Sequence, residues 1–265
     1  MHELHMVVCM KVVPKSEEIR VDSETHRLDR ANARSEFNPP DMNALEMALQ
    51  VKDHHGGRVT ILSMGPPFVE PFLRIALAMG ADEAILLSDR AFAGADTLAT
   101  TYTLAKGIES LGSVDLIFCG EESSDGATGQ VPSGLAEWLN AAQITLVRHI
   151  ELDRSRGRVK GKREIKGGHE VLEVPTPAVI SVKTASNEPR FMDFGIKEWA
   201  FDEASVLVWD QEMLGADEAH IGQKGSPTIV IGLDHAETRE RRKIFLEGTP
   251  QDVATQIVDA IRDRL

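Results

Sequence analysis

Several kinds of residue are scarce in this sequence, and each shortage excludes a class of protein. The chain has only two cysteines among 265 residues, Cys9 and Cys119, and both lie inside apolar runs. Cysteines in such surroundings are expected to be buried, reduced thiols, so neither a disulfide framework nor a zinc site is predicted. No stretch reaches the roughly 18 consecutive apolar residues of a membrane-spanning helix. The first residues also lack a cleavable signal pattern, so a cytoplasmic protein without membrane insertion is predicted.

Basic residues are outnumbered by acidic ones. The chain has 29 Lys and Arg against 42 Asp and Glu, a formal net charge of -13 at pH 7. Because such a surface repels polyanions, nucleic acid is not an expected partner. Aromatic residues make up only 5% of the chain, but hydrophobic residues make up 42%. That content is enough for one large domain, or for one domain with an appendage.

Strand-like and helix-like segments alternate over the first half of the chain. Short apolar runs predict strands at residues 6–13, 58–64, 83–87 and 114–120. Helices are predicted between them, the first entered through Asn38-Pro39-Pro40-Asp41 and the third capped by Asp96 or Thr97. This alternation implies right-handed crossovers and a parallel sheet covered on both faces. The predicted fold class is α/β, a doubly wound, mostly parallel, Rossmann-like sheet.

The pattern changes after Ala142, where three segments predict antiparallel strands. They form a small hairpin insertion at about 144–175. Basic residues at every second position from Arg154 to Lys162 indicate a solvated face, with docking of an acidic partner as the alternative. The apolar segment TPAVISVKTA then returns to the main sheet. The domain built in this way covers residues 1–212.

Two later segments follow the strands of the predicted sheet, and each leaves two interpretations open. The stretch SNEPRFMDFGIKEWAF has four aromatic residues and no helical or strand period, so it predicts either a loop tucked into the core or a contact surface. Residues 213–265 form a C-terminal arm that ends in a helix from Thr249 to Arg264, with Thr249 as its cap. The arm is expected to wrap around a partner or to fold back on its own domain.

Parallel strands bring their carboxyl ends to one edge, where open α/β sheets bind ligands. The loops that meet there are residues 9–14, 63–67, 88–97 and 120–130. The last loop has two glycines and short polar side chains, and it leads into a helix whose first amides can hold a phosphate without a lysine. It matches neither GxGxxG nor GxxxxGK[ST]. On the residues alone, an ordinary connecting loop therefore remains the alternative.

No catalytic set is found. The chain has no GxSxG elbow around Ser123 or Ser124, and its histidines lack the spacing of metal ligands. Glu121 and Glu122 would repel a phosphate unless a metal intervened. No catalytic residue and no metal-binding residue is predicted: the site binds, and its ligand supplies the chemistry.

Several short segments resemble those of a known family and follow one another in the same order as in that family. They are VVCMKVVP, NPPDMNALEMAL, ILSMGPP, LRIALAMGADEAILLSDRAFAGADTLAT, DLIFCG followed by DGATGQV, and NEPRF. Each segment alone is weakly specific, but together they are highly specific. From Met6 to about Leu246 the sequence resembles the β subunit of electron-transfer flavoprotein, closer to its electron-bifurcating branch.

The resemblance implies a heterodimer whose α subunit carries a redox-active FAD and accepts electrons from dehydrogenases such as acyl-CoA dehydrogenases. β subunits of this family hold a nucleotide of their own: AMP in ordinary members, a second FAD in bifurcating members. The run SDRAFAGADTLAT resembles the bifurcating branch, so FAD is favoured over AMP. The implied function is to shuttle electrons between NADH or an acyl-CoA dehydrogenase and a further acceptor, such as a membrane oxidoreductase. A nucleotide-binding regulatory module without redox work is the alternative.

The resemblance also implies roles for individual residues. The adenosine part would be surrounded by Cys9, Met10, Asn38, Asp41, Met64 and Gly65. The phosphate would be held by Ser123, Asp125, Gly126, Thr128, Gly129, Gln130 and Val131. Cys119 ends the strand that leads to this loop and belongs to the same site, and Asp96 and Thr97 would approach the flavin.

Two positions depart from the family's pattern. Glu121, followed by Glu122, stands where the family usually has a basic residue, and Ala127 replaces an acidic residue of DGDT. Both changes alter the charge beside the phosphate. The segment at about 187–200 resembles the family's recognition loop, which favours the contact surface over the buried loop. The residues implied to contact the partner dehydrogenase are Phe191, Met192, Phe194 and Ile196.

Overall fold

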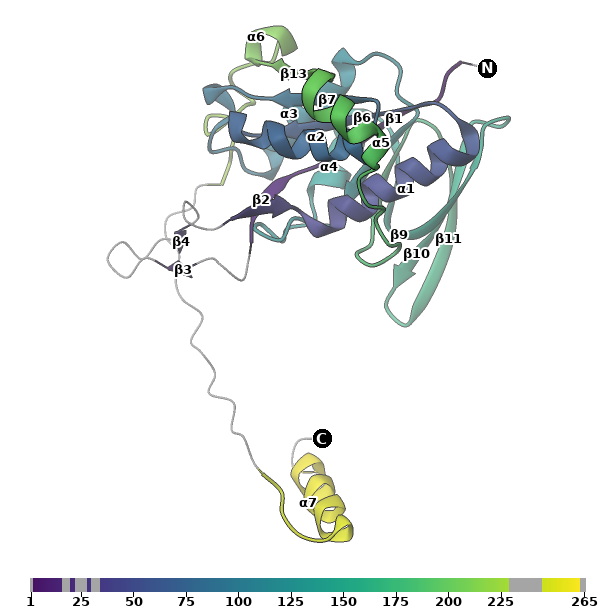
Figure 1. The fold of residues 1–265 in the computed structure, drawn as a ribbon, viewed down its shortest axis with the longest axis vertical. Helices are drawn as coiled ribbons and strands as arrows, with labels where there is room; N and C mark the ends of the chain where they lie inside the picture. The colour runs from purple at the N-terminus through teal and green to yellow at the C-terminus, as the bar shows by residue number, and fades with distance from the viewer. Residues whose placement is uncertain (1, 16–19, 22–27, 30–33, 229–244, 263–265) are drawn as a thin grey trace. The chain divides into compact units, whose positions relative to one another are not determined.

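The computed structural model describes residues 2–15, 20–21, 28–29, 34–228 and 245–262 (Figure 1). Contacts along the chain divide it into two compact units, Met1–Gly232 and Leu233–Leu265. The main sheet belongs to the first unit, and helix α7 (Pro250–Arg262) belongs to the second. No helix in these described ranges is both long and apolar enough to cross a bilayer.

The described part of the first unit contains a nine-stranded sheet in the order β11-β10-β9-β12-β8-β1-β6-β7-β13. Every neighbouring pair from β9 to β13 is parallel, whereas the β9–β10 and β10–β11 pairs are antiparallel. The fold confirms the predicted α/β class with a mostly parallel sheet. The strands are β1 (His5–Cys9), β6 (Arg58–Met64), β7 (Glu83–Leu87), β8 (Leu116–Gly120), β9 (Ala142–Asp153), β10 (Arg158–Ile165), β11 (Gly168–Pro175), β12 (Ala178–Val182) and β13 (Val206–Trp209).

Helices cover both faces of the sheet. Because side chains alternate along a strand, Val8 of β1 packs in one apolar cluster with Leu45 of α1, whereas Val7 packs in another with Tyr102 of α3. An apolar cluster fills the space between the sheet and the helices on each face. A binding site is therefore expected at the loops that follow the strand ends. The helices are α1 (Pro39–His55) and α2 (Glu70–Ala78) on the first face and α3 (Thr97–Ser110) and α4 (Val131–Trp138) on the second.

The first predicted strand, residues 6–13, is in fact two strands. β1 ends at Cys9, and β2 (Val12–Pro14) pairs antiparallel with β5 (Ser35–Phe37) outside the main sheet. Between them, the amide of Lys11 donates to Asp41 Oδ2 at 2.8 Å. The prediction of one strand was wrong because MVVCMKVV is apolar on both sides of this break and has no glycine or proline to mark it.

The charged connection after Pro14 has the hairpin character expected of it. β3 (Arg20–Val21) and β4 (Leu28–Asp29) pair antiparallel. The rest of the connection, residues 16–19, 22–27 and 30–33, lies outside the described residues.

The predicted hairpin at about 144–175 is antiparallel, and it also extends the main sheet. β9 pairs parallel with β12 through its first residues and antiparallel with β10 through its last residues. The strand bends at Leu146, which has a φ of 58° and whose amide donates to Ser181 Oγ at 3.0 Å. Antiparallel pairing is therefore confirmed, and the return of TPAVISVKTA to the sheet is confirmed by β12.

The stretch expected to have no helical period contains two short helices. α5 (Phe194–Glu198) is capped by Asp193, whose Oδ1 accepts from the Gly195 amide at 2.6 Å. The π-helical turn η4 (Trp199–Glu203) continues it. The expectation was wrong because helices of five residues are too short to show a period of 3.6. β13, which was not predicted from the sequence, then pairs parallel with β7.

The chain that follows β13 packs on α3. Leu214, Ala216 and Ile221 belong to the apolar cluster that contains Tyr102. Leu214 ends α6 (Gln211–Leu214). The first unit's packing therefore continues past residue 213, where the sequence analysis begins the C-terminal arm. Residues 229–244 of that arm lie outside the described residues.

Helix α7 begins as the sequence predicts. Pro250 is its first residue, the Asp252 amide donates to Thr249 Oγ1 at 3.3 Å, and the Thr249 amide donates to Asp252 Oδ2 at 2.9 Å. This reciprocal pair satisfies amides that a helix start leaves without partners. The predicted cap at Thr249 is confirmed.

Candidate functional site

The carboxyl ends of β8, β1, β6 and β7 lie side by side at one edge of the sheet. Cys9 is in register with Leu62 on one side and with Cys119 on the other, and Met64 is in register with Leu87. The predicted convergence of four loops is confirmed. Both cysteines are buried in the core, as predicted, and their side chains lie beneath the surface at this edge.

Asn38 holds the start of the phosphate loop, which we define as residues 121–131. Its Nδ2 donates to the Glu122 carbonyl at 2.8 Å, and its Oδ1 accepts from the Ser124 amide at 3.0 Å. The side chain is 1% exposed. Asn38 therefore positions the backbone of the loop from the entrance of α1.

Asp41 is a buried carboxyl group at the same edge. Its Oδ1 accepts from Asn38 Nδ2 at 3.0 Å and from the Gly120 amide at 3.1 Å, while its Oδ2 accepts from the Lys11 amide. Burial outweighs these donors and raises the pKa of Asp41 from 3.8 to about 7. Only glycine suits position 120, because a Cβ there would collide with Asp41 Oδ1 and with the Pro40 backbone.

The phosphate loop is shaped by two residues in left-handed conformations. Ala127 has a φ of 47° and Gly129 has a φ of 62°, and Gln130 follows with right-handed angles of -90° and -23°. Alternating left- and right-handed residues aim successive N–H groups to one concave side. The amides of residues 128–131 have no hydrogen-bond partner within the described part of the chain. Gln130 caps α4 and Val131 is its first residue, so the loop and the start of the helix together form a cradle suited to an anion.

Acidic side chains beside this cradle are paired with lysines. The Asp125 carboxylate accepts from Lys11 Nζ at 2.7 and 2.8 Å. Glu121 accepts from Lys183 Nζ at 2.8 Å and from the Thr184 hydroxyl at 2.6 Å. Burial acts to raise the pKa of Glu121, but these donors outweigh it and hold the pKa below its usual range. The negative charge of Glu121 is thus offset by Lys183.

The loop after β7 contacts the phosphate loop directly. Thr97 Oγ1 donates to Gln130 Oε1 at 2.8 Å. Asp96 caps α3, as predicted, by accepting from the amides of Leu98 and Ala99 at 2.9 and 3.1 Å. The structure therefore brings together the residues predicted to approach a flavin and those predicted to hold its phosphate.

The remaining predicted residues line the strand ends. Met10 is 3% exposed and packs in the core, and its amide donates to the Leu62 carbonyl at 2.9 Å. Met64 and Gly65 are half-buried where β6 ends. These positions lie along the same edge as the cradle, at the ends of β1 and β6.

Ser63 begins one of the four loops predicted to meet at this edge, but no role in the site was predicted for it. Its side chain is 1% exposed, and its Oγ has no hydrogen-bond partner among the residues that the structure describes. Leaving a buried hydroxyl unpaired costs about 1–3 kcal/mol. A polar ligand atom would remove this cost. The signal in the sequence was a serine within the otherwise apolar end of RVTILSM.

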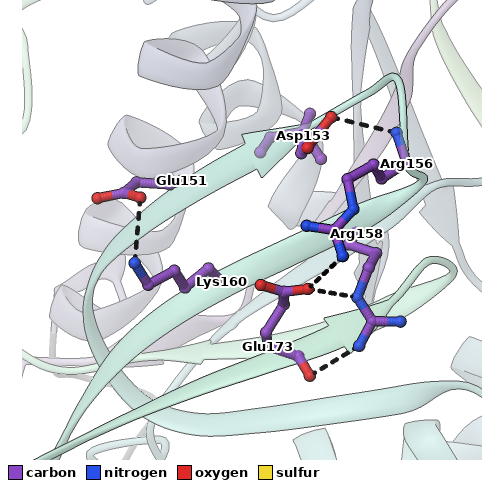
Figure 2. Close-up of a pocket in the computed structure, with 7 residues that line it drawn as sticks. Glu151, Asp153, Arg156, Arg158, Lys160 and Glu173 are labelled. Carbon is purple, nitrogen blue, oxygen red and sulfur yellow. Dashed lines mark hydrogen bonds and ion pairs between the residues drawn. The ribbon is translucent and has the colours of Figure 1, made fainter.

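A surface hollow elsewhere on the molecule is lined by side chains that form ion pairs with one another. Figure 2 shows its basic and acidic side chains turned toward one another, with Arg158 Nε 2.6 Å from Glu173 Oε1. The adjoining turn lies at the amino end of the parallel strands, because Arg154 donates to the carbonyl of His2, just before β1. The hollow is lined by Glu151, Leu152, Asp153, Arg156, Arg158, Lys160 and Glu173. In the described ranges, no group of three or more His, Cys, Asp or Glu could hold a metal ion.

The residues predicted to contact a partner differ in exposure. Phe191 and Phe194 are 95% and 88% exposed. Met192 and Ile196 are half-buried, and Met192 packs against the core. Two large aromatic side chains are therefore left in solvent by a segment whose base is packed.

Comparison with known proteins identifies the family to which the chain belongs. The family described as "Electron transfer flavoprotein domain" matches residues 25–211, more than half of the chain. The chain belongs to the electron transfer flavoprotein family. Electron transfer flavoprotein subunit beta of Clostridium acetobutylicum is 40% identical over 260 residues, which are 98% of each chain. Caffeyl-CoA reductase-Etf complex subunit CarD of Acetobacterium woodii is 37% identical over 98% of this chain and 99% of its own.

A third relative, protein FixA of Azotobacter vinelandii, is 41% identical over 256 residues, which are 94% of this chain and 90% of its own. The resemblance to β subunits is thus confirmed, and the chain is an electron-transfer subunit of this family. The matched residues 25–211 include the entrance of α1, the phosphate loop and the exposed aromatic residues.

Proposed function

We propose that this member of the electron transfer flavoprotein family is the β subunit of a heterodimer and binds FAD at the carboxyl edge of its sheet. It would shuttle electrons between NADH or an acyl-CoA dehydrogenase and a further acceptor. The observation that supports this most directly is the row of amides at residues 128–131, which have no partner among the described residues and lie at the edge where four strand ends meet. Amides at a helix start carry partial positive charge and favour a phosphate.

The residues at this edge suit the parts of such a ligand. Cys9, Met10, Met64 and Gly65 line the strand ends where an adenosine would lie. Next to them is the hydroxyl of Ser63, which has no partner in the described part of the chain. The phosphate-holding residues remain Ser123, Asp125, Gly126, Thr128, Gly129, Gln130 and Val131. The Lys11 side chain, 47% exposed, pairs with Asp125, so the negative charge of Asp125 beside the loop is offset within the chain.

FAD is favoured over AMP because the edge continues past the phosphate cradle. Thr97 contacts Gln130, so the loop of residues 88–97 lies next to the cradle. The second half of a dinucleotide could face this loop, whereas AMP has no second half. Asp96 would stay at the cap of α3 and fix the loop's position.

A bound flavin supplies hydride and single-electron chemistry. The chain's own residues would bind and orient it: the amides hold the phosphates, and the buried pair Asn38 and Asp41 keeps loop and strands together. If the protein is of the bifurcating type, this flavin would supply the separation of the two electrons of NADH between two acceptors.

Two surfaces are proposed for partners. The C-terminal arm, residues 213–265, would contact the α subunit through the apolar side of α7, where Ile257 and Ile261 are 44% and 51% exposed. The exposed Phe191 and Phe194 would contact an acyl-CoA dehydrogenase or a membrane oxidoreductase. Large exposed apolar side chains favour such a role.

The proposal is tested by the nucleotides that the complex holds. The α and β chains are copurified and denatured, and the released nucleotides are separated by chromatography and quantified. Two FAD per heterodimer would support the proposal, whereas one FAD and one AMP would reduce it to a single-flavin carrier with a structural nucleotide.

The alternative is a regulatory module without redox work. A stable monomer that binds an adenine nucleotide, contains no flavin and does not bind an α chain would favour this alternative over the electron carrier.

A further inference from the structure

The exposed aromatic side chains belong to a segment that is fastened at both ends. We define the aromatic segment as residues 191–203, which include α5 and η4. Arg190 lies directly before it, and Arg74 of α2 reaches the carbonyl groups at its end. Each arginine is also paired with a glutamate on a helix of the sheet domain.

At the beginning of the segment, Arg190 and Glu46 form a multiply bonded pair. Arg190 Nε lies 2.8 Å from Glu46 Oε2, Nη2 lies 3.1 Å from Oε1, and the Arg190 amide donates to Oε2 at 3.1 Å. Glu46 is 5% exposed. Burial acts to raise the pKa of Glu46, but the bonds from Arg190 outweigh it and keep the pKa below its usual range. A charged pair with this geometry resists displacement.

A pair of amide side chains reinforces this attachment. Asn43 Nδ2 donates to the Asn187 carbonyl at 2.8 Å, and Asn187 Nδ2 donates to the Asn43 carbonyl at 2.9 Å. Asn43 is 5% exposed and lies one turn before Glu46 on α1. The residues before the aromatic segment are therefore fixed to α1 along two turns.

At the other end, Arg74 binds carbonyl groups in and just after η4. Its Nη1 donates to the carbonyls of Ala200, Phe201 and Ala204 at 3.0, 3.1 and 2.9 Å. Glu70, one turn earlier on α2, holds the same guanidinium at 2.9 Å. Because Ala200 is fully buried, this end is anchored by packing as well as by charge.

Between these attachments the aromatic side chains point away from the core. Phe191 and Phe194 are almost fully exposed, and Trp199 and Phe201 are 38% and 37% exposed. The Asp193 amide also donates to the Ala78 carbonyl at 2.8 Å, so loss of the arginine contacts would loosen the ends of the segment and leave its middle attached. A segment held in its binding shape loses less conformational freedom when it docks.

We propose that the pairs Arg190–Glu46 and Arg74–Glu70 are positioning pairs that keep Phe194 and its neighbours in the conformation that docks on an acyl-CoA dehydrogenase. This inference rests on the proposed function, since it assigns the supports of the surface proposed there. The arginines themselves need not touch the dehydrogenase.

The first measurement needs no dehydrogenase. Hydrogen exchange is followed in the copurified heterodimer at the amides of Lys197 and Ala204, which donate to the carbonyls of Asp193 and Trp199. Arg190→Met and Arg74→Met are each expected to speed exchange in the segment about tenfold. Lys52→Met is the matched control, because it breaks the Lys52–Asp82 pair, another ion pair of α1.

The second measurement follows electron transfer from a purified acyl-CoA dehydrogenase reduced with butyryl-CoA. Both arginine variants are expected to raise KM for the heterodimer about tenfold while kcat and FAD content change less than about twofold. Arg190→Lys should recover part of the loss, since a lysine keeps the charge but not the paired geometry. In a Phe194→Ala background, Arg190→Met should raise KM little further.

The outcomes separate the two levels of inference. If Phe194→Ala leaves KM unchanged, the proposed docking surface is wrong. If Phe194→Ala raises KM but both arginine variants behave like Lys52→Met, the surface stands and the positioning pairs do not. An equal effect of Arg190→Met with and without Phe194 also overturns the inference, because Arg190 would then act through something else. Arg74→Met keeps the test decisive if Arg190→Met fails to fold.

Discussion

At the scale of single residues, the candidate site depends on buried polar groups that hold its backbone. The side chains of Asn38 and Asp41 form hydrogen bonds with backbone amides and a backbone carbonyl of the loop and of strand β8. The sequence indicates the helix entrance at Asn38-Pro39-Pro40-Asp41, since Asn and Pro are common there. It cannot show that Asp41 bonds the amides of Lys11 and Gly120, because those contacts join residues 30 and 79 positions apart.

Asp41 should make stability depend on pH near neutrality. Its pKa is 3.8 ordinarily and about 7 in the folded chain, so between these values the folded chain binds more protons than the unfolded chain. The contribution of Asp41 to the free energy of unfolding is therefore largest below its ordinary pKa and falls as the pH rises through about 7. Asp41→Asn should abolish this trend. As the pH rises toward about 7, the free energy of unfolding of the wild type should fall relative to that of the variant by up to about 1.4 kcal/mol per pH unit.

Guanidinium unfolding of both chains between about pH 5 and about pH 8 measures the difference. Glu109→Gln, which removes an exposed carboxyl paired with Lys106, is the control: it keeps Asp41, so its difference in stability from the wild type should not show this trend. A difference between wild type and Asp41→Asn that stays constant over this range would show that Asp41 keeps its charge when buried.

Gly129 should be essential for holding a nucleotide. A valine at its φ of 62° is strained, and its Cβ would lie 3.4 Å from the Glu121 carbonyl. Gly129→Val is expected to reduce the nucleotide retained after purification to less than about a tenth of the wild-type amount. Gly167→Val is the matched control: it has a φ of 85°, nothing lies within 4 Å of its Cβ, and it is in the turn between β10 and β11. Normal nucleotide content in Gly129→Val would show that the loop does not hold the nucleotide.

At the scale of elements, long apolar runs were predictable and short elements were not. β6, β7 and β8 are bounded by charged residues, glycine or proline, and their apolar patterns predict them. The break at Lys11 depends on the bond from the Lys11 amide to Asp41, and the five-residue α5 depends on the bond from the Gly195 amide to Asp193. Such contacts leave no period in the sequence. The four-residue β13 is likewise too short to stand out.

Helix α7 offers a test of its own cap. Thr249→Ala removes the hydroxyl that accepts from the Asp252 amide and should destabilise the helix by about 1 kcal/mol. Hydrogen exchange at Val253, whose amide donates to the Thr249 carbonyl at 3.0 Å, should become about fivefold faster in the whole chain. Thr255→Ala, in the helix interior, should not speed it, because alanine is the better helix former there. Equal exchange in Thr249→Ala and wild type would show that the cap contributes nothing.

At the scale of the whole molecule, the sheet brings distant segments to one edge, and this convergence was predictable from the order of strands and helices alone. The pairing of charges there was not. Lys11 with Asp125 and Glu121 with Lys183 join residues 114 and 62 positions apart, and they offset acidic side chains that the sequence showed only as unpaired charges. The presence and identity of a nucleotide at this edge remain predictions that the released ligand will decide.

The division into two units predicts the effect of removing the second. A chain that ends at Gly232 keeps the bonds from Thr228 to Asp96 and the packing of Ile221, so its free energy of unfolding should stay within about 0.5 kcal/mol of the whole chain. It should lose binding to the α subunit in size-exclusion chromatography, as should the full-length variant Ile257→Asp/Ile261→Asp. Full binding by the shortened chain would place the contact with the α subunit on the sheet domain. A large loss of stability would instead show that the two units are one folding unit.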